Sequence, residues 1–170
     1  MTANPTDRAR RVIDRHLFVP HYLAVLANGM IWSQSRFYLE NYAAGINEVR
    51  LITVIAHTPN QTAKQLSGIL VMNKSIVSRS LGELKIKDLV REETVGRSRT
   101  FTLTDAGCDL NEKIVRISLE RERRLLAGFT PNDKAILIGY LARMFDNLAS
   151  TVDLEQMAAD DRSGNSAAAK

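Results

Sequence analysis

The chain has 170 residues, a formal net charge of +4 and one cysteine. This length suits a single domain with a sizeable core, and one cysteine excludes an internal disulfide, which favours the reducing cytoplasm. Because no signal-peptide core and no run of about 18 apolar residues occurs, we expect a chain without a membrane span.

Two apolar helices are expected first. After a short helical turn between Arg10 and Leu17, Pro20 is suited to be the first residue of a helix ending near Tyr42. A second helix is expected from its cap, Asn47, to about His57. The apolar side chains of this helix point in nearly every direction, which predicts a central position. Much of one side of the first helix is apolar: Leu23, Leu26, Met30 and Phe37.

Two short helices with a tight connection follow. Thr62 and Gln65 have the spacing of a capping box, and the helix they begin has an apolar face of Leu66, Ile69 and Leu70. Asn73 is a suitable N-cap for the next helix, which is expected to end near Lys87. This arrangement predicts a helix-turn-helix.

The second of these helices has two contrasting faces. Apolar residues recur at Val77, Leu81 and Leu84, while small polar side chains and one guanidinium share the opposite face: Ser75, Ser78, Arg79 and Gly82. That face is suited to close approach to an anionic polar surface. An ordinary amphipathic surface helix is the alternative.

A basic hairpin is expected next. The segments 89–93 and 100–103 have the composition of short strands, and the loop between them, Thr94 to Arg99, holds Arg97 and Arg99. From Lys74 to Arg99 there are seven Lys/Arg against four Asp/Glu. A helix-turn-helix followed by a basic hairpin predicts a winged helix, although a solvated basic surface also accounts for the charge.

Two more helices complete the pattern. Thr104 is expected to cap a long helix to about Gly128, and Leu103 has the spacing from Cys108 of a hydrophobic staple. Thr130, Pro131 and Asp133 then start a last helix. Its apolar stripe consists of Leu137, Leu141, Met144 and Leu148.

The segment from about Gly45 to Leu110 resembles the MarR family of bacterial transcriptional regulators. Matching pieces are Gly45-Ile-Asn, Ala63-Lys-Gln-Leu-Ser, Val77-Ser-Arg79, Leu84, Leu89-Val-Arg91 and Leu103-Thr-Asp-Ala-Gly107. The chain departs from the family at the wing, where Val95 replaces the usual Asp two residues before Arg97.

The resemblance implies a mainly α fold with a small β-hairpin wing. We expect one domain over residues 1–170, in which 46–104 form the winged-helix DNA-binding region and 105–128 a long linking helix. Residues 10–44 and 131–152 would be dimerisation helices, and residues 153–170 have the composition of a disordered tail. A homodimer suits a pseudo-palindromic operator in double-stranded DNA.

DNA contacts are expected from both parts of the winged helix. Ser75, Ser78 and Arg79 are candidates for the major groove, with Arg79 suited to guanine. Lys64 and Lys74 are candidates for phosphates, and Asn73 opens the helix whose first amides favour an anion. Arg97 and its neighbour Arg99 are candidates for the minor groove, although Arg99 is equally placed to pair with Glu92 or Glu93 across the hairpin.

Family members commonly bind phenolic or aromatic carboxylate compounds, so a small aromatic effector is expected. Arg50 stands out because it interrupts an apolar helix and needs an anionic partner, either a ligand or an acid of the chain. The other candidates combine rings, a thioether and a cation, and several also suit a core or an interface: His16, His21, Tyr22, Met30, Trp32 and Arg36.

Other functions are less well supported. The histidines lack metal-ligand spacing, no phosphate-binding glycine loop occurs, and we expect neither an enzyme nor a cofactor. A redox sensor is disfavoured because Cys108 is assigned to the staple. A winged helix that binds only proteins, and a DNA-binding regulator without an effector, remain as alternatives.

Overall fold

The structure is a computed structural model that describes residues 12–151. The chain divides into two compact units, one ending at Ser118 and the other starting at Leu119, where the sequence predicts one domain. The expected tail at 153–170 and the outermost residues of the two expected dimerisation segments lie outside the described residues. Between residues 12 and 151, no helix is both long and apolar enough to cross a membrane.

Helix α1 (Val19–Tyr42) begins after Phe18, so Pro20 is its second residue and not its first. The helical turn expected between Arg10 and Leu17 is reduced, in its described part, to one turn in which the Leu17 amide donates to the Asp14 carbonyl (3.0 Å). Most of the predicted apolar side of α1 is exposed within the chain, since Leu23, Leu26 and Met30 keep 40–51% of their accessible surface.

Helix α2 (Ile46–His57) is the centre of the first unit, as its apolar sequence predicts. Its N-cap is Gly45, and the prediction that Asn47 caps it is wrong. The reason is Glu48, whose carboxylate reaches back from the third helical position to accept the Gly45 amide (2.5 Å). The core residues of α2 are nearly inaccessible to solvent: Val49, Leu51, Ile52 and Ile55.

Helices α3 (Ala63–Leu70) and α4 (Lys74–Ile86) form the predicted helix-turn-helix. The capping box of α3 is confirmed, since the Thr62 amide donates to Gln65 Oε1 (2.8 Å) and the Gln65 amide donates to Thr62 Oγ1 (3.3 Å). Leu66 is buried, whereas Ile69, assigned to the same apolar face, is 48% exposed. The short helix therefore packs through a narrower face than predicted.

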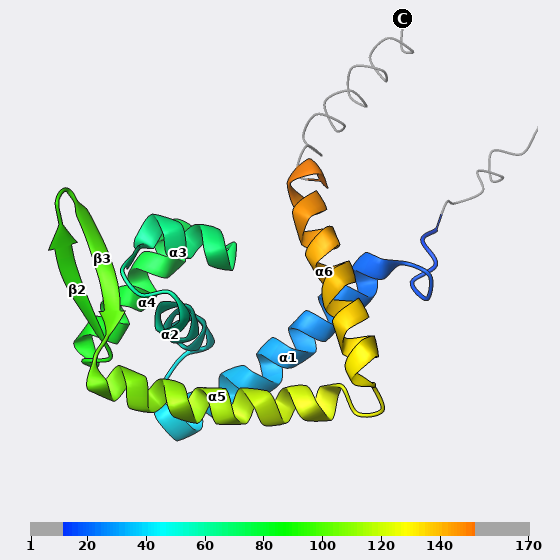
Figure 1. The fold of residues 1–170 in the computed structure, drawn as a ribbon, viewed down its shortest axis with the longest axis horizontal. Helices are drawn as coiled ribbons and strands as arrows, with labels where there is room; N and C mark the ends of the chain where they lie inside the picture. Colours follow the sequence, from blue (N-terminus) through cyan, green and yellow to red (C-terminus); the bar gives the residue numbers. More distant parts are fainter. Residues whose placement is uncertain (1–11, 152–170) are drawn as a thin grey trace, which may run out of the picture. The chain divides into compact units, whose positions relative to one another are not determined.

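The sheet has three antiparallel strands in the order β1-β3-β2: β1 (Gln61–Thr62), β2 (Val90–Val95) and β3 (Ser98–Leu103). Strand β1 was not predicted, because two residues are too few to show alternation. Val95 pairs with Ser98, so only Gly96 and Arg97 form the tip, in place of a longer loop. Gly96 has the positive φ (63°) that glycine supplies at the first position of such turns. Figure 1 shows this hairpin beside α3 and α4.

Helix α5 (Asp105–Leu125) packs at its amino end against Asp88 and Leu89, the residues just before β2. Thr104 caps it as predicted, accepting the Gly107 amide at Oγ1 (3.0 Å), and its hydroxyl donates to the Asp88 carbonyl (2.6 Å). A Cβ added at Gly107 would lie 2.0 Å from the Leu89 carbonyl oxygen. Glycine is therefore required where α5 crosses Leu89, the residue just before β2.

The staple predicted for Cys108 does not bury it, since this side chain is exposed. The buried face of α5 runs through Gly107, Leu110 and Ile114, and Cys108 lies next to that face and not on it. Cys108 and Leu103 nevertheless line the same hollow, of about 370 Å³.

Helix α6 (Pro131–Thr151) follows a turn in which Gly128 has a φ of 89°. Helix α5 ends at Leu125, three residues before its predicted stop. The predicted cap of α6 is confirmed, because the Asp133 amide donates to Thr130 Oγ1 (3.1 Å) and the Thr130 amide to Asp133 Oδ2 (2.9 Å). Many apolar side chains of α6 are exposed within the chain: Ile136, Ile138, Tyr140, Leu141, Phe145 and Leu148.

Candidate DNA-binding surface

Helix α4 has a sharply divided surface. Val77, Leu81 and Leu84 are at most 2% exposed, which confirms the predicted inward stripe. Ser80 is buried beside them and was not predicted to be. The opposite side, which we call the outward ridge, consists of Ser75, Ser78, Arg79 and Gly82, of which the first three are exposed and the last is half-buried.

The start of α4 is closed by its own cap. Asn73 Oδ1 accepts the Ser75 amide (2.9 Å) and the Ser75 hydroxyl (2.8 Å). The cap satisfies one of the free amides of the first turn. Lys74 is exposed next to it, and Lys64 is exposed on α3. The helix-turn-helix thus carries Lys64, Lys74 and Arg79 in solvent.

The hairpin tip exposes Arg97, while Arg99 has a partner in the free chain. The Arg99 guanidinium lies 3.3 Å from Glu92 Oε1, the alternative that the sequence left open. Lys85, at the end of α4, also pairs with Glu92. The hydrogen bond from Lys85 lowers the pKa of Glu92 against the opposing effect of desolvation, and attraction by Lys85 and Arg99 adds to the lowering. Glu92 therefore braces the wing against α4, although the acid usual at position 95 is absent.

A second polar contact fixes the far end of α4. The Lys87 ammonium donates to Glu48 Oε1 (2.6 Å) and to the Ala43 carbonyl (2.8 Å). Glu48 is 3% exposed and also accepts the Gly45 amide. Sequence reasoning missed Lys87 and Glu48, because they are 39 residues apart and no local pattern joins them.

Arg50 is not paired with an acid as expected. Its guanidinium donates to the Leu70 carbonyl (3.1 Å), at the carboxyl end of α3. A cation at this position interacts favourably with the free carbonyls of the last helical turn. Because this carbonyl already binds the Arg50 guanidinium, Arg50 does not need the anionic partner that the sequence suggested.

The other candidates for an effector site lie in or just before α1. His16, Tyr22, Met30 and Trp32 are exposed, and Trp32 keeps 84% of its accessible surface. His21 is half-buried, with its ring edge-on to Tyr22 at 5.9 Å. Arg36 pairs with Glu40 (2.7 Å) on the same helix. These side chains are therefore presented to solvent and do not line a common enclosed cavity within the described part of the chain.

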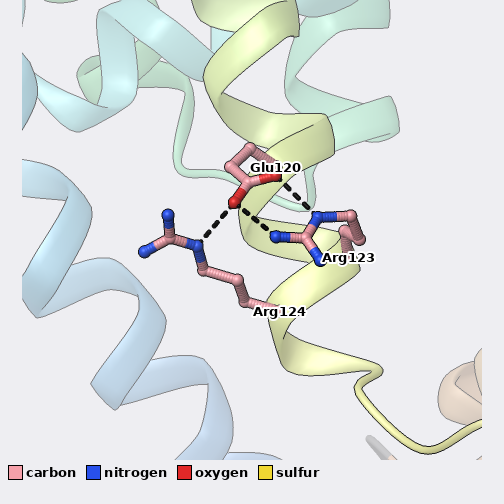
Figure 2. Close-up of polar contacts among 3 residues, drawn as sticks. All are labelled: Glu120, Arg123 and Arg124. Atoms are coloured by element: carbon pink, nitrogen blue, oxygen red, sulfur yellow. Dashed lines mark hydrogen bonds and ion pairs between the residues drawn. The ribbon is translucent and has the colours of Figure 1, made fainter.

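The charged stretch at the end of α5 forms a local cluster, shown in Figure 2. Arg123 binds both carboxylate oxygens of Glu120 (2.8 Å each), and Arg124 binds one of them (2.6 Å). These hydrogen bonds lower the pKa of Glu120 to about 2. Because all these hydrogen bonds join residues three or four apart on α5, their effect is to fix side chains along the helix.

Comparison with solved structures gives close matches in fold. A MarR/EmrR-family transcriptional regulator from Acinetobacter sp. ADP1 is 26% identical, with a TM-score of 0.75 over 82% of this chain and 99% of the other. A MarR-family regulator from Listeria monocytogenes, complexed with a 26mer DNA, is 17% identical with a TM-score of 0.75, over 82% and 95%.

A MarR protein from Peptoclostridium difficile is 17% identical, with a TM-score of 0.74 over 84% of this chain and 95% of that one. No family model and no curated protein sequence matches the chain. The winged-helix fold expected from the sequence is thus confirmed by the structural neighbours, which are MarR-family transcriptional regulators.

Proposed function

We propose that this chain, which has the fold of MarR-family transcriptional regulators, is a DNA-binding regulator that places α4 in the major groove of double-stranded DNA. The observation that carries the proposal is the outward ridge of α4, which exposes small polar side chains and one guanidinium opposite a fully buried apolar stripe. A structural neighbour from Listeria monocytogenes was solved with DNA.

Each cation has a separate role in this proposal. The planar fork of Arg79 binds two acceptors of a guanine, flanked by the hydroxyls of Ser75 and Ser78. Lys64 and Lys74 bind phosphates, which adds salt-dependent affinity without sequence information. Arg97, at the two-residue tip of the wing, enters the minor groove.

Asn73 and Arg99 contribute differently from the free cations. Asn73 holds the first turn of α4 by capping it, so its effect on DNA is through the position of Ser75. Arg99 starts from an ion pair with Glu92 and reaches DNA only when that pair opens or when a phosphate competes for it.

The assembly we propose is a homodimer that binds a pseudo-palindromic operator. Support comes from the apolar side chains that α1 and α6 each leave exposed, because exposed apolar patches mark interaction sites. A two-fold axis would place two copies of α4 about one DNA turn apart.

The regulation we propose is repression released by a small aromatic acid. Support comes from side-chain chemistry alone: the exposed ring of Trp32 and thioether of Met30 suit an aromatic face. Arg36 supplies a cation for a carboxylate, which would replace its partner in the free chain, Glu40. Such a compound releases DNA only if it binds the dimer more tightly at one spacing of the two α4 helices than at another.

The test of DNA binding is a gel shift with genomic fragments at several salt concentrations. We expect Arg79→Ala to weaken binding to a selected fragment about tenfold or more, which is the range for one bidentate base contact. The control is Arg116→Ala, which removes an exposed arginine from α5. Equal loss in both variants, or no salt-dependent shift in the native chain, favours a protein-interaction module.

The test of regulation is a thermal-shift screen of phenols and aromatic carboxylates, followed by operator competition. We expect a ligand that raises the melting temperature of the chain and weakens operator binding. If operator binding is present but no compound changes it, the regulator works without such an effector.

A further inference from the structure

The turn between α3 and α4 contains a valine in an unfavourable backbone conformation. Val71 is the C-cap of α3, with φ 49° and ψ 50°. This left-handed region normally suits glycine or asparagine at the end of a helix, and a β-branched residue there is an outlier. The other non-glycine residues with positive φ in residues 12–151 are Ala43, Asn60 and Asp88, none of which is β-branched.

The folded chain does not explain why a valine stands here. Val71 keeps 64% of its accessible surface, so it gains little from burial. Backbone strain of this kind is concentrated at sites that bind something, where the contact made in the complex offsets it. The side chain is therefore a candidate for an apolar contact outside the chain.

A second aliphatic side chain is exposed just beyond the turn. Ile76 is in the first turn of α4 and is 41% exposed, although its neighbour Val77 is fully buried. Ile76 and Arg79 are one helical turn apart, so their side chains are neighbours on the helix surface. An apolar group thus stands beside the guanidinium assigned to guanine.

From this placement we infer that Val71 and Ile76 contact thymine 5-methyl groups in the major groove, next to the base bound by Arg79, an inference that rests on the proposed function. Thymine is the base that presents a methyl group in that groove, and apolar side chains read it. The amino-terminal residues of a recognition helix are those that reach base edges.

Charge favours DNA over a second copy of the chain as the occupant. The helix-turn-helix that carries Val71 and Ile76 also exposes Lys64, Lys74 and Arg79. Two like surfaces of this kind repel each other, whereas a phosphate backbone attracts them.

The test uses a duplex enriched by this protein from a random DNA library, and a second set in which each thymine in turn is replaced by uracil. Uracil lacks only the 5-methyl group. We expect at least one exchange to weaken binding about fourfold, which corresponds to about 0.8 kcal/mol for one buried methyl group. The exchanged base should lie within a few base pairs of the guanine for which Arg79→Ala loses its preference.

The variants assign the effect to the two side chains. In Ile76→Ala, and in Val71→Gly, we expect the uracil-to-thymine ratio of dissociation constants to fall toward one at an affected position. The matched control is Val115→Ala on α5, where the native side chain is 42% exposed, and its ratio stays at the native value.

Val71→Gly has a second readout that separates binding from folding. Removing the left-handed valine relieves backbone strain, so Tm is expected to rise by about 2 to 4 °C while DNA binding weakens. A Tm that does not rise overturns the premise that the valine is strained for binding.

The outcomes distinguish this inference from the proposed function. If a duplex is enriched and Arg79→Ala weakens its binding, but no uracil exchange does, DNA binding stands and the thymine contact is overturned. If the uracil-to-thymine ratio of dissociation constants exceeds one in the native chain and keeps the same value in both variants, other residues contact the methyl group and the assignment is overturned. If no duplex is enriched, the proposed function fails as well.

Discussion

Lys87 lies at the end of α4 and donates to Glu48 Oε1 across 2.6 Å, although 39 residues separate the two in sequence. The same ammonium donates to the Ala43 carbonyl, where α1 ends. One side chain thus joins the carboxyl end of α1, the amino end of α2 and the carboxyl end of the candidate reading helix.

Replacing Lys87 with methionine is expected to destabilise the fold. The substitution leaves the buried carboxylate of Glu48 with only the Gly45 amide, and a buried charge without its partner is costly. Because the Lys87 side chain is 35% exposed, water moderates the loss to about 2 kcal/mol. Urea unfolding measures it, and Lys113→Met on the surface of α5 is the control.

The double variant Lys87→Met with Glu48→Met separates the pair from the positions themselves. We expect it to recover part of the loss, since neither charge then remains buried. Losses that simply add in the double variant would show that the two groups are not coupled.

Replacing Glu92 with glutamine is expected to strengthen DNA binding. The change releases Arg99 and Lys85 from their shared acid, so the wing presents more positive charge and the slope of log K against log salt steepens by about one. The effect on the free energy of unfolding is expected to be small, because Arg99 is 76% exposed and water screens the pair.

The control for this charge change is Glu112→Gln on α5, which removes the same charge without freeing a wing cation. Equal strengthening in both variants would attribute the effect to net charge. Weaker binding in Glu92→Gln would show that the brace positions the wing and that its loss outweighs the gained charge.

Glu120 is expected to titrate with a pKa of about 2, held down by hydrogen bonds from Arg123 and then Arg124. A carboxyl whose pKa is lowered in the folded state stabilises the fold at pH values above its ordinary pKa of 4.5. This contribution is therefore lost as the pH falls from about 4.5 to about 2. The carboxyl resonance of Glu120, followed by NMR against pH, measures the midpoint.

Methionine at Arg123 and Arg124 removes both donors and both positive charges, and is expected to return the Glu120 midpoint toward 4.5. The side chains are largely exposed, so the accompanying change in unfolding free energy is small. An unchanged midpoint in the double variant would contradict the assigned cause.

A charge on the apolar side of α1 is expected to disrupt the proposed homodimer. Leu26 is 51% exposed in the single chain, so glutamate there is tolerated by the monomer but not at an apolar interface. Sedimentation velocity should show Leu26→Glu as a monomer while Val115→Glu keeps the native mass. A native chain that is already monomeric at micromolar concentration would exclude the dimer.

Local patterns predicted much of the first unit correctly. The capping box at Thr62 and Gln65 and the cap at Asn73 are contacts between residues two or three apart, and the sequence displays them directly. The inward stripe of α4 follows from helical periodicity. The capping of α6 by Thr130 was predictable for the same reason.

Contacts between distant residues were not predictable. The cap of α2 was assigned to Asn47 by residue type, whereas the Glu48 carboxylate accepts the Gly45 amide; its second contact, with Lys87 39 residues away, has no local signal in the sequence. Arg50 was expected to need an anion, and a helix-end carbonyl 20 residues away binds it instead. Cys108 was placed by spacing alone, and the packing face of α5 leaves it exposed.

The absence of a side chain at Gly107 has a mechanical result. Helix α5 rests directly on the peptide group of Leu89, and the Thr104 amide donates to that same carbonyl (3.2 Å). Main chain touches main chain at this crossing, with no flexible side chain between them to absorb displacement. The first turns of α5 and the hairpin are therefore expected to tilt together when a force acts on the tip.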